Sequence, residues 1–334
     1  MAPQSGLVEL PLANAARGRP LRSAAWCAMA VVVAMALDAM RVPLGGIRLG
    51  AQLNWLDLAA GACLAAALFV PGTLRSRASW TTPLDGRVIA GVLVSILQVL
   101  PGSGEVNGHV WLRQTIECTA LFYGLTVLVR AQPGAAESLW DVVAAACVLL
   151  SVHALLGATN GVVSLRAASE AADGGWAAQS GLFKTTLFVT ILCAGRALDR
   201  GAGNGWRVIA LLGAAGTIIH GATSGTGLHA SMLARLDAPV HFSNVVVMLL
   251  LLSGLLKQAW ELRRKRREEA SRWRGAALAI VALGIMGVFG GATGGSGLRA
   301  LAAVVAVLLV TRGEQAVKGE TLPLPEYADQ QRAA

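Results

Sequence analysis

Long apolar blocks alternate with short polar connections along the whole chain. Each block has about 16–20 residues and is apolar on nearly all sides, as a helix that crosses lipid hydrocarbon must be. The blocks therefore predict an all-α, polytopic bundle of about ten transmembrane helices. We expect these helices at residues 24–40, 53–71, 87–101, 113–130, 139–157, 180–198, 206–224, 240–258, 274–290 and 296–311.

Composition supports a membrane protein over a soluble one. Apolar types make up 55% of the residues and charged types only 14%, whereas about a quarter of a soluble domain is charged. We expect one transmembrane domain over residues 24–312, flanked by polar tails at 1–23 and 313–334. The first apolar block lacks a convincing small-residue cleavage site after it, which favours a retained anchor over a removed signal peptide.

Charge predicts the orientation. The formal net charge is +9, and the basic residues gather in alternate connections, which the positive-inside rule makes cytoplasmic. This predicts a multi-pass protein of the cytoplasmic (inner) membrane, with both termini in the cytoplasm and membrane lipids rather than nucleic acid as its partners. The basic positions include Arg75, Arg77, Arg87, Arg130, Arg196, Arg200, Arg207, Arg263, Arg264, Lys265, Arg266, Arg267, Arg272 and Arg274.

The five cysteines lie inside apolar blocks, and no two have CxxC spacing. They are interpreted as small buried residues, so neither a disulfide framework nor a zinc site is predicted. No phosphate loop, zinc-protease motif or hydrolase elbow is found in the sequence. The cysteine positions are Cys27, Cys63, Cys118, Cys147 and Cys193.

One internal repeat is visible. Residues 221–230 (GATSGTGLHA) match residues 291–300 (GATGGSGLRA) at seven of ten positions, and residues 157–161 (GATNG) are a weaker echo. All three are expected at the outer ends of helices. Duplicated helix pairs, as in many transporters, produce such a pattern, although a Gly/Ala-rich composition also yields chance matches.

The ionisable residues of the outer half are candidates for function. Such groups are costly near the membrane and usually functional. Arg113 and Glu117 are four residues apart and are expected to share a helix face, while Lys184 either serves a site or extends to the interface. The full set is Arg48, Glu105, His109, Arg113, Glu117, His153, Arg166, Asp173, Lys184, His220, His229, Arg235, Asp237, His241 and Arg299.

The densest polar stretch runs from His229 to Asn244 and is expected to be an outer loop. His241 has the side chain of a general base, and Arg235 that of a diphosphate clamp. This combination suits transfer from a polyprenyl-diphosphate-linked donor. The alternative is an interfacial loop whose polar residues merely meet water.

In layout the chain resembles the O-antigen ligase and polymerase-like membrane glycosyltransferases. The resemblance rests on segments 41–48 (RVPLGGIR), 53–58 (LNWLDL), 111–113 (WLR), 223–225 (TSG) and 241–244 (HFSN). It departs from the family in its short outer loop and in Gly225, where the family often has an arginine. The resemblance implies transfer or handling of a lipid-linked glycan. His241 and Arg235 are then the catalytic candidates, and Arg113, Arg48, Arg299 and Lys184 the substrate-binding ones.

Two other classes stay open. A weaker resemblance to haem A synthase-like proteins implies haem ligation through His153, His220 and His241, although the paired motif of that family is missing. A transporter or non-enzymatic assembly factor is also compatible with the repeat. The leading interpretation needs no cofactor and no metal.

Overall fold

The structure is a computed structural model of the chain. It describes residues 23–39, 54–73, 76–97, 99, 108–132, 135–159, 175–199, 202–236, 242–266, 269–289 and 296–317. Within these residues the protein is all-α, with ten α-helices, one short 3₁₀ turn and no strand. The predicted fold class is confirmed to that extent.

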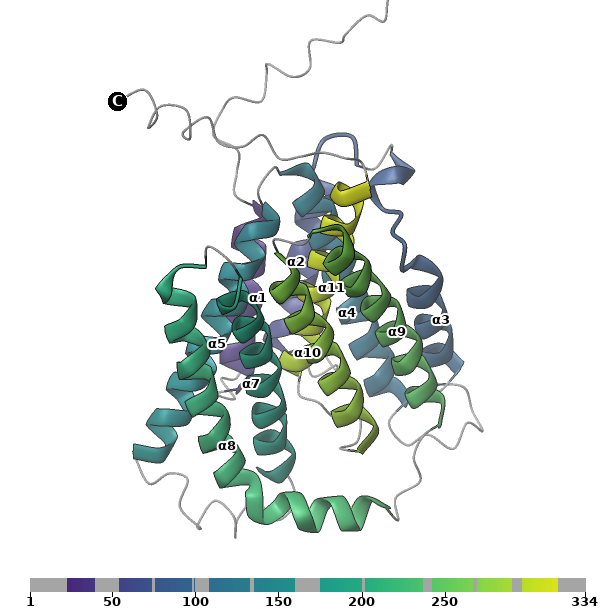
Figure 1. The fold of residues 1–334 in the computed structure, drawn as a ribbon. Helices are drawn as coiled ribbons and strands as arrows, with labels where there is room; N and C mark the ends of the chain where they lie inside the picture. The colour runs from purple at the N-terminus through teal and green to yellow at the C-terminus, as the bar shows by residue number, and fades with distance from the viewer. Residues whose placement is uncertain are drawn as a thin grey trace, which may run out of the picture.

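Each predicted block coincides with one helix. The helices are α1 (Ser23–Ala39), α2 (Trp55–Leu68), α3 (Asp85–Leu97), α4 (Gly108–Ala131), α5 (Ala135–Thr159), α7 (Gly175–Ala197), α8 (Asn204–Leu236), α9 (Phe242–Lys265), α10 (Ala270–Phe289) and α11 (Ser296–Val317), with the 3₁₀ turn η2 at Arg77–Ser79. They lie side by side, and successive helices run in opposite directions (Figure 1). The start of α1 and the end of α11 therefore lie at the same end of the bundle. This end is called the basic end below, and the opposite one the outer end.

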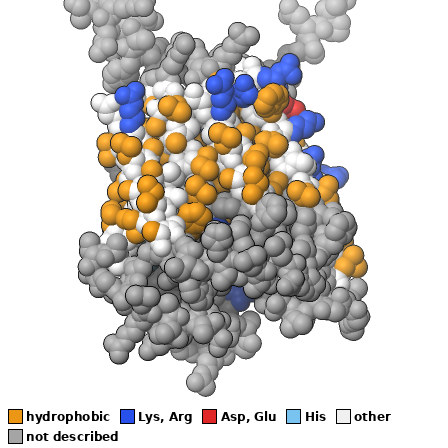
Figure 2. Space-filling view, turned by 60° about the horizontal axis from the view of Figure 1, so that its bottom comes forward, with side chains coloured by type: hydrophobic (Ala, Val, Ile, Leu, Met, Phe, Trp, Pro, Cys, Tyr) orange, Lys and Arg blue, Asp and Glu red, His pale blue; other side chains and the backbone are white. Residues whose placement is uncertain are grey.

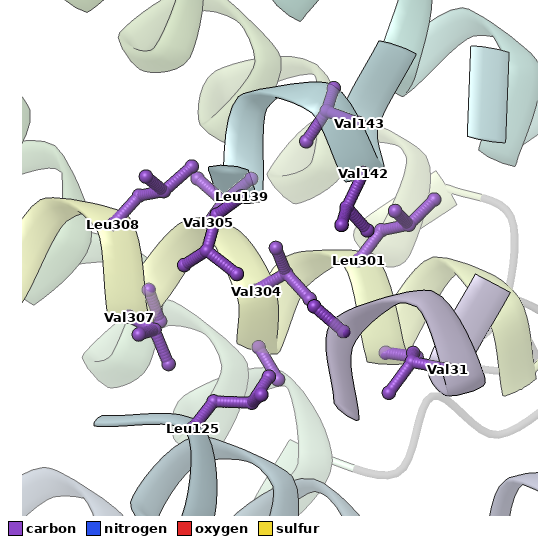
Figure 3. Close-up of a cluster of buried hydrophobic side chains, with 14 of the residues drawn as sticks. Val31, Leu125, Leu139, Val142, Val143, Leu301, Val304, Val305, Val307 and Leu308 are labelled. Atoms are coloured by element: carbon purple, nitrogen blue, oxygen red, sulfur yellow. The ribbon is translucent and has the colours of Figure 1, made fainter. Parts of the chain in front are cut away.

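Helix α11 lies in the middle of the packing. It contacts α1, α4, α5, α7 and α9, and its residues 303–312 are all buried. Val305 and Leu308 of α11 lie beside Leu139 of α5, Leu301 lies beside Val142, and Leu125 of α4 approaches from the other side (Figure 3). A helix enclosed in this way must be apolar on every face, which explains its unbroken run of Ala, Val and Leu.

The sequence predicted about ten spans, whereas among the described residues two helices are long and apolar enough to cross a membrane. They are Ala135–Gly157, whose apolar window is 56% buried within the protein, and Asn204–Ala222, whose window is only 17% buried. By length and composition these two segments support a membrane location. The low burial of the second shows that its apolar side chains face outward.

Two glycines permit a close contact between α7 and α10. A Cβ atom built on Gly195 of α7 lies 2.6 Å from the Cα of Gly275 of α10, and the converse distance is the same. Only hydrogen side chains permit this approach, so the crossing of α7 and α10 depends on both glycines.

The structure corrects one feature of the repeat. Residues 221–230 lie inside α8, which continues to Leu236, so the first copy does not mark a helix end. Residues 296–300 of the second copy open α11, and residues 291–295 lie outside the described part of the chain. An unbroken helix keeps its backbone groups hydrogen-bonded internally, which outweighs the weak helix propensity of its glycines.

Candidate functional site

The predicted loop from His229 to Asn244 is wrong in its first half. Residues 229–236 belong to α8, and the last part of that helix turns to run across the outer end of the bundle (Figure 1). Arg235 therefore stands in the last turn of a helix rather than in a loop. The side chain of Arg235 is not among those described, and His241, Asp237 and Arg48 lie outside the described residues.

Arg113 is tied to the start of α2. Its Nε donates to Oδ1 of Asp57 at 3.2 Å, and its Nη2 pairs with Oδ2 of the same carboxylate. Asp57 also accepts a hydrogen bond of 2.7 Å from the backbone N of Asn54, as in a capping box. Asp57 thus anchors α4 to the first turn of α2. Spacing along the chain indicated Glu117 as a partner of Arg113 but did not indicate Asp57.

Glu117 and Arg299 lie on two helices that are in contact. Glu117, in α4, is only 5% exposed, and Arg299 lies in the first turn of α11. Helices α4 and α11 pack directly against each other. The structure therefore brings Arg113, Glu117 and Arg299 into the outer halves of neighbouring helices.

Lys184 is buried inside the protein. It is 7% exposed, and the two threonines that follow it in α7, Thr185 and Thr186, are also buried. The sequence left open that Lys184 extends along the outside of the bundle to reach water. A lysine in that position would be exposed, and Lys184 is not. A buried ammonium requires polar or anionic surroundings.

Two histidines meet between α5 and α8. The rings of His153 and His220 are stacked, with centroids 5.9 Å apart and planes inclined by 25°. His220 is 7% exposed, and its Nε2 is 3.4 Å from the carbonyl oxygen of Leu150, to which it donates. One ring nitrogen of His220 is therefore already used by the backbone.

A larger polar cluster lies at the basic end, where the sequence pattern indicated topology alone. Arg272 donates from Nε to Oδ2 of Asp199 at 2.8 Å and from Nη1 to Glu137 at 3.2 Å. Glu137 also pairs with Arg312, which is 2% exposed, and with Arg196. This cluster joins the ends of α5, α7, α10 and α11.

Tryptophans surround the same cluster. Arg272 lies over the ring of Trp140 at 5.5 Å, and Arg196 over Trp206 at 5.6 Å. Trp140 in turn meets both Trp206 and Trp273 edge to face. Burial raises the pKa of Asp199 to about 6 against the opposing effect of Arg196. One feature of the sequence could have predicted this cluster: acidic residues stand near basic ones at the ends of several predicted helices.

Arg130 forms a separate clamp nearby. It pairs with Glu314 of α11 and donates to the carbonyl oxygens of Ser79 and Thr81, each at 2.8 Å. These bonds hold the η2 turn against α4 and α11. Because the contacts of Arg130 and of the cluster all bridge elements, we assign both to the assembly of the bundle.

Comparisons with known protein families, with curated protein sequences and with solved structures found no match to this chain. The geometry above is therefore the basis for assigning a function.

Proposed function

We propose that the chain is a polytopic protein of the cytoplasmic membrane, with its ten helices spanning the bilayer and the basic end in the cytoplasm. The support is an apolar surface that a soluble protein would hide. On α8, Val208, Leu211 and Ile218 are each at least 63% exposed. In Figure 2, hydrophobic side chains form a broad band beneath a row of basic ones, the order that a bilayer and its cytoplasmic headgroups favour.

We further propose that the outer half of this bundle binds a polyprenyl-diphosphate-linked glycan, which the protein handles or transfers. The observation that carries this proposal is the burial of Lys184 in the outer half of α7. Ionisable groups at such depth are costly and usually mark a ligand or ion site. Arg299, in the first turn of α11, lies on a helix that packs against α7.

The contacts of Arg113 change its proposed role. Asp57 already occupies two donors of the Arg113 guanidinium, so Arg113 is assigned a positioning role. Lys184 and Arg299 are proposed to contact the diphosphate because Lys184 is buried and Arg299 lies on a neighbouring helix. Arg113 then positions the start of α4 beside them. Diphosphate binding by Arg235 and Arg48 and general-base catalysis by His241 stay predictions.

The test is binding of a polyprenyl-diphosphate sugar to the purified protein in neutral nanodiscs. Lys184→Met should weaken binding by about tenfold or more, since one charge-assisted hydrogen bond is worth about 1.5–3 kcal/mol. Lys184→Arg should retain part of the affinity. Lys265→Met, which removes an exposed lysine at the basic end, is the matched control and should bind as the wild type does. Equal affinity in Lys184→Met would remove this lysine from the site, and absence of binding by the wild type would reject the glycan proposal.

The contact between His153 and His220 is the observation that favours haem as a second candidate. Its test is the visible spectrum of the protein purified in mild detergent. A stoichiometric Soret band that is lost in His220→Ala would favour haem over a glycan. If neither ligand binds, a transporter or an assembly factor becomes the leading class.

A further inference from the structure

Two groups of basic residues at the basic end differ in how their charge is balanced. In the first group the positive charge is neutralised within the protein. Arg130 pairs with Glu314, Arg196 and Arg272 with Asp199, Arg312 with Glu137, and Arg266 with Glu269. These side chains hold helices together and offer little net charge to a partner.

The end of α9 forms the second group. Within the described residues, no carboxylate lies within ion-pair distance of Arg263, Arg264 or Lys265. Lys257 has one acidic neighbour, Glu261, at 4.0 Å, and its side chain is 68% exposed. The positive charge of this segment can therefore interact with a partner outside the protein.

The exposed positions of this segment continue a single face of α9. Leu250, Ser253, Lys257, Trp260 and Arg264 follow one another at spacings of three and four, so they share one side of the helix. All five are exposed, while Leu255, Ala259 and Leu262 on the other side are buried. We call these five residues the α9 face.

The α9 face changes from apolar to cationic along its length. Leu250 is apolar, Lys257 and Arg264 are cationic, and Trp260, which is amphipathic and 53% exposed, lies between these two cations. Lys257 and Arg264 are seven residues apart, about 10 Å along a helix. Arg263 adds a further charge beside the α9 face, with its guanidinium 4.6 Å from the centroid of the Trp260 ring. Hydrocarbon, interface and phosphate follow one another in the same order across a membrane leaflet.

We propose that Lys257, Trp260 and Arg264 of the α9 face bind the phosphate headgroup of an acidic phospholipid in the cytoplasmic leaflet. This inference rests on the membrane location in the proposed function and is independent of the glycan. A lipid accounts for the exposed Leu250 and Leu249 below the charges as well as for the charges themselves. An acidic protein partner would account for the charges only.

The experiment compares phosphatidylglycerol with phosphatidylcholine binding to the purified full chain by native mass spectrometry. The wild type should prefer phosphatidylglycerol, and each of Lys257→Gln and Arg264→Gln should lower that preference about fivefold, the effect of one basic residue near an anionic surface. The pair of charge-retaining changes Lys257→Arg and Arg264→Lys should keep it. Arg207→Gln, which removes an exposed arginine at the start of α8, is the comparison and should lower the preference less than Lys257→Gln or Arg264→Gln does, because among the described residues of α8 Arg207 has no second exposed cation at the spacing found on the α9 face.

Two results would overturn the inference, and they differ in meaning. An unchanged preference in the two glutamine variants would reject the α9 face alone and leave the membrane proposal intact. Failure of the wild type to enter phosphatidylcholine vesicles and resist carbonate extraction would reject the membrane location and this inference with it.

Discussion

Asp199 caps helix α10 from the end of α7. Its Oδ1 accepts a hydrogen bond of 2.8 Å from the backbone N of Arg272, and its Oδ2 accepts one of 2.8 Å from the Nε of the same residue. Both side chains are almost fully buried, at 2% and 5% exposure. One carboxylate thus satisfies a free N–H group at a helix start and neutralises a buried guanidinium.

Removing this carboxylate should destabilise the protein strongly. Asp199→Ala leaves Arg272 buried with one partner fewer, and breaking a buried pair from one side costs about 3–5 kcal/mol. The measurement is thermal or denaturant unfolding in detergent. Glu261→Ala, which breaks the exposed pair with Lys257, is the control and should change stability by less than about 0.5 kcal/mol. Equal loss of stability in the two variants would contradict the buried pair of Asp199 and Arg272.

A methyl group at the α7–α10 crossing should also be costly. Gly195→Ala places a Cβ 2.6 Å from the Cα of Gly275, so the two helices must separate. Overpacking of this kind costs about 1–3 kcal/mol. Gly61→Ala on α2 is the matched control because no neighbouring atom lies within 4 Å of the position that its added methyl group would take. There the change should stabilise the helix by about 0.5–1 kcal/mol. A stabilising effect of Gly195→Ala would show that the helices do not touch there.

Two pairs of cysteines should cross-link on mild oxidation. Cys63 Sγ donates to the carbonyl oxygen of Cys27 at 3.7 Å, and Cys147 and Cys193 are buried on α5 and α7, which pack against each other. Copper phenanthroline should therefore join α1 to α2 and α5 to α7, as peptide mass spectrometry can detect. Cys118 is the internal control and should stay unlinked. Random pairing, or linkage of Cys118 to any other cysteine within one chain, would contradict these helix contacts.

The proposed orientation predicts the outcome of reporter fusions. A reporter active only in the cytoplasm should work when fused after Arg267, between α9 and α10, and one active only outside should work when fused after Asp173, before α7. The reason is the concentration of basic residues at one end of the bundle. The reverse pattern at both sites would invert the orientation and place Lys184 on the cytoplasmic side.

Helix positions could be predicted from the apolar blocks because each block is long enough and apolar enough to form one helix of the bundle. Only α8 departs widely from its predicted range, since its glycines and polar residues resemble a helix end but continue as helix to Leu236. The sequence identified ionisable residues such as Lys184 as candidates for a site. It did not predict that the side chain of Lys184 is buried, because the same position in a helix is compatible with a side chain that faces lipid or one that faces the protein interior.

The sequence alone determined the number of described helices, the all-α class and the concentration of basic residues at one end, since these depend on composition over windows of about 20 residues. Which charged side chains pair with each other was decided only by the tertiary structure. Asp57 and Arg113 are 56 residues apart, and Glu137 and Arg312 are 175 apart. No local spacing rule reaches such separations. These residues meet because α2 packs on α4 and α5 lies beside α11. Only the packing of the helices shows that these charged residues form ion pairs that hold the bundle together.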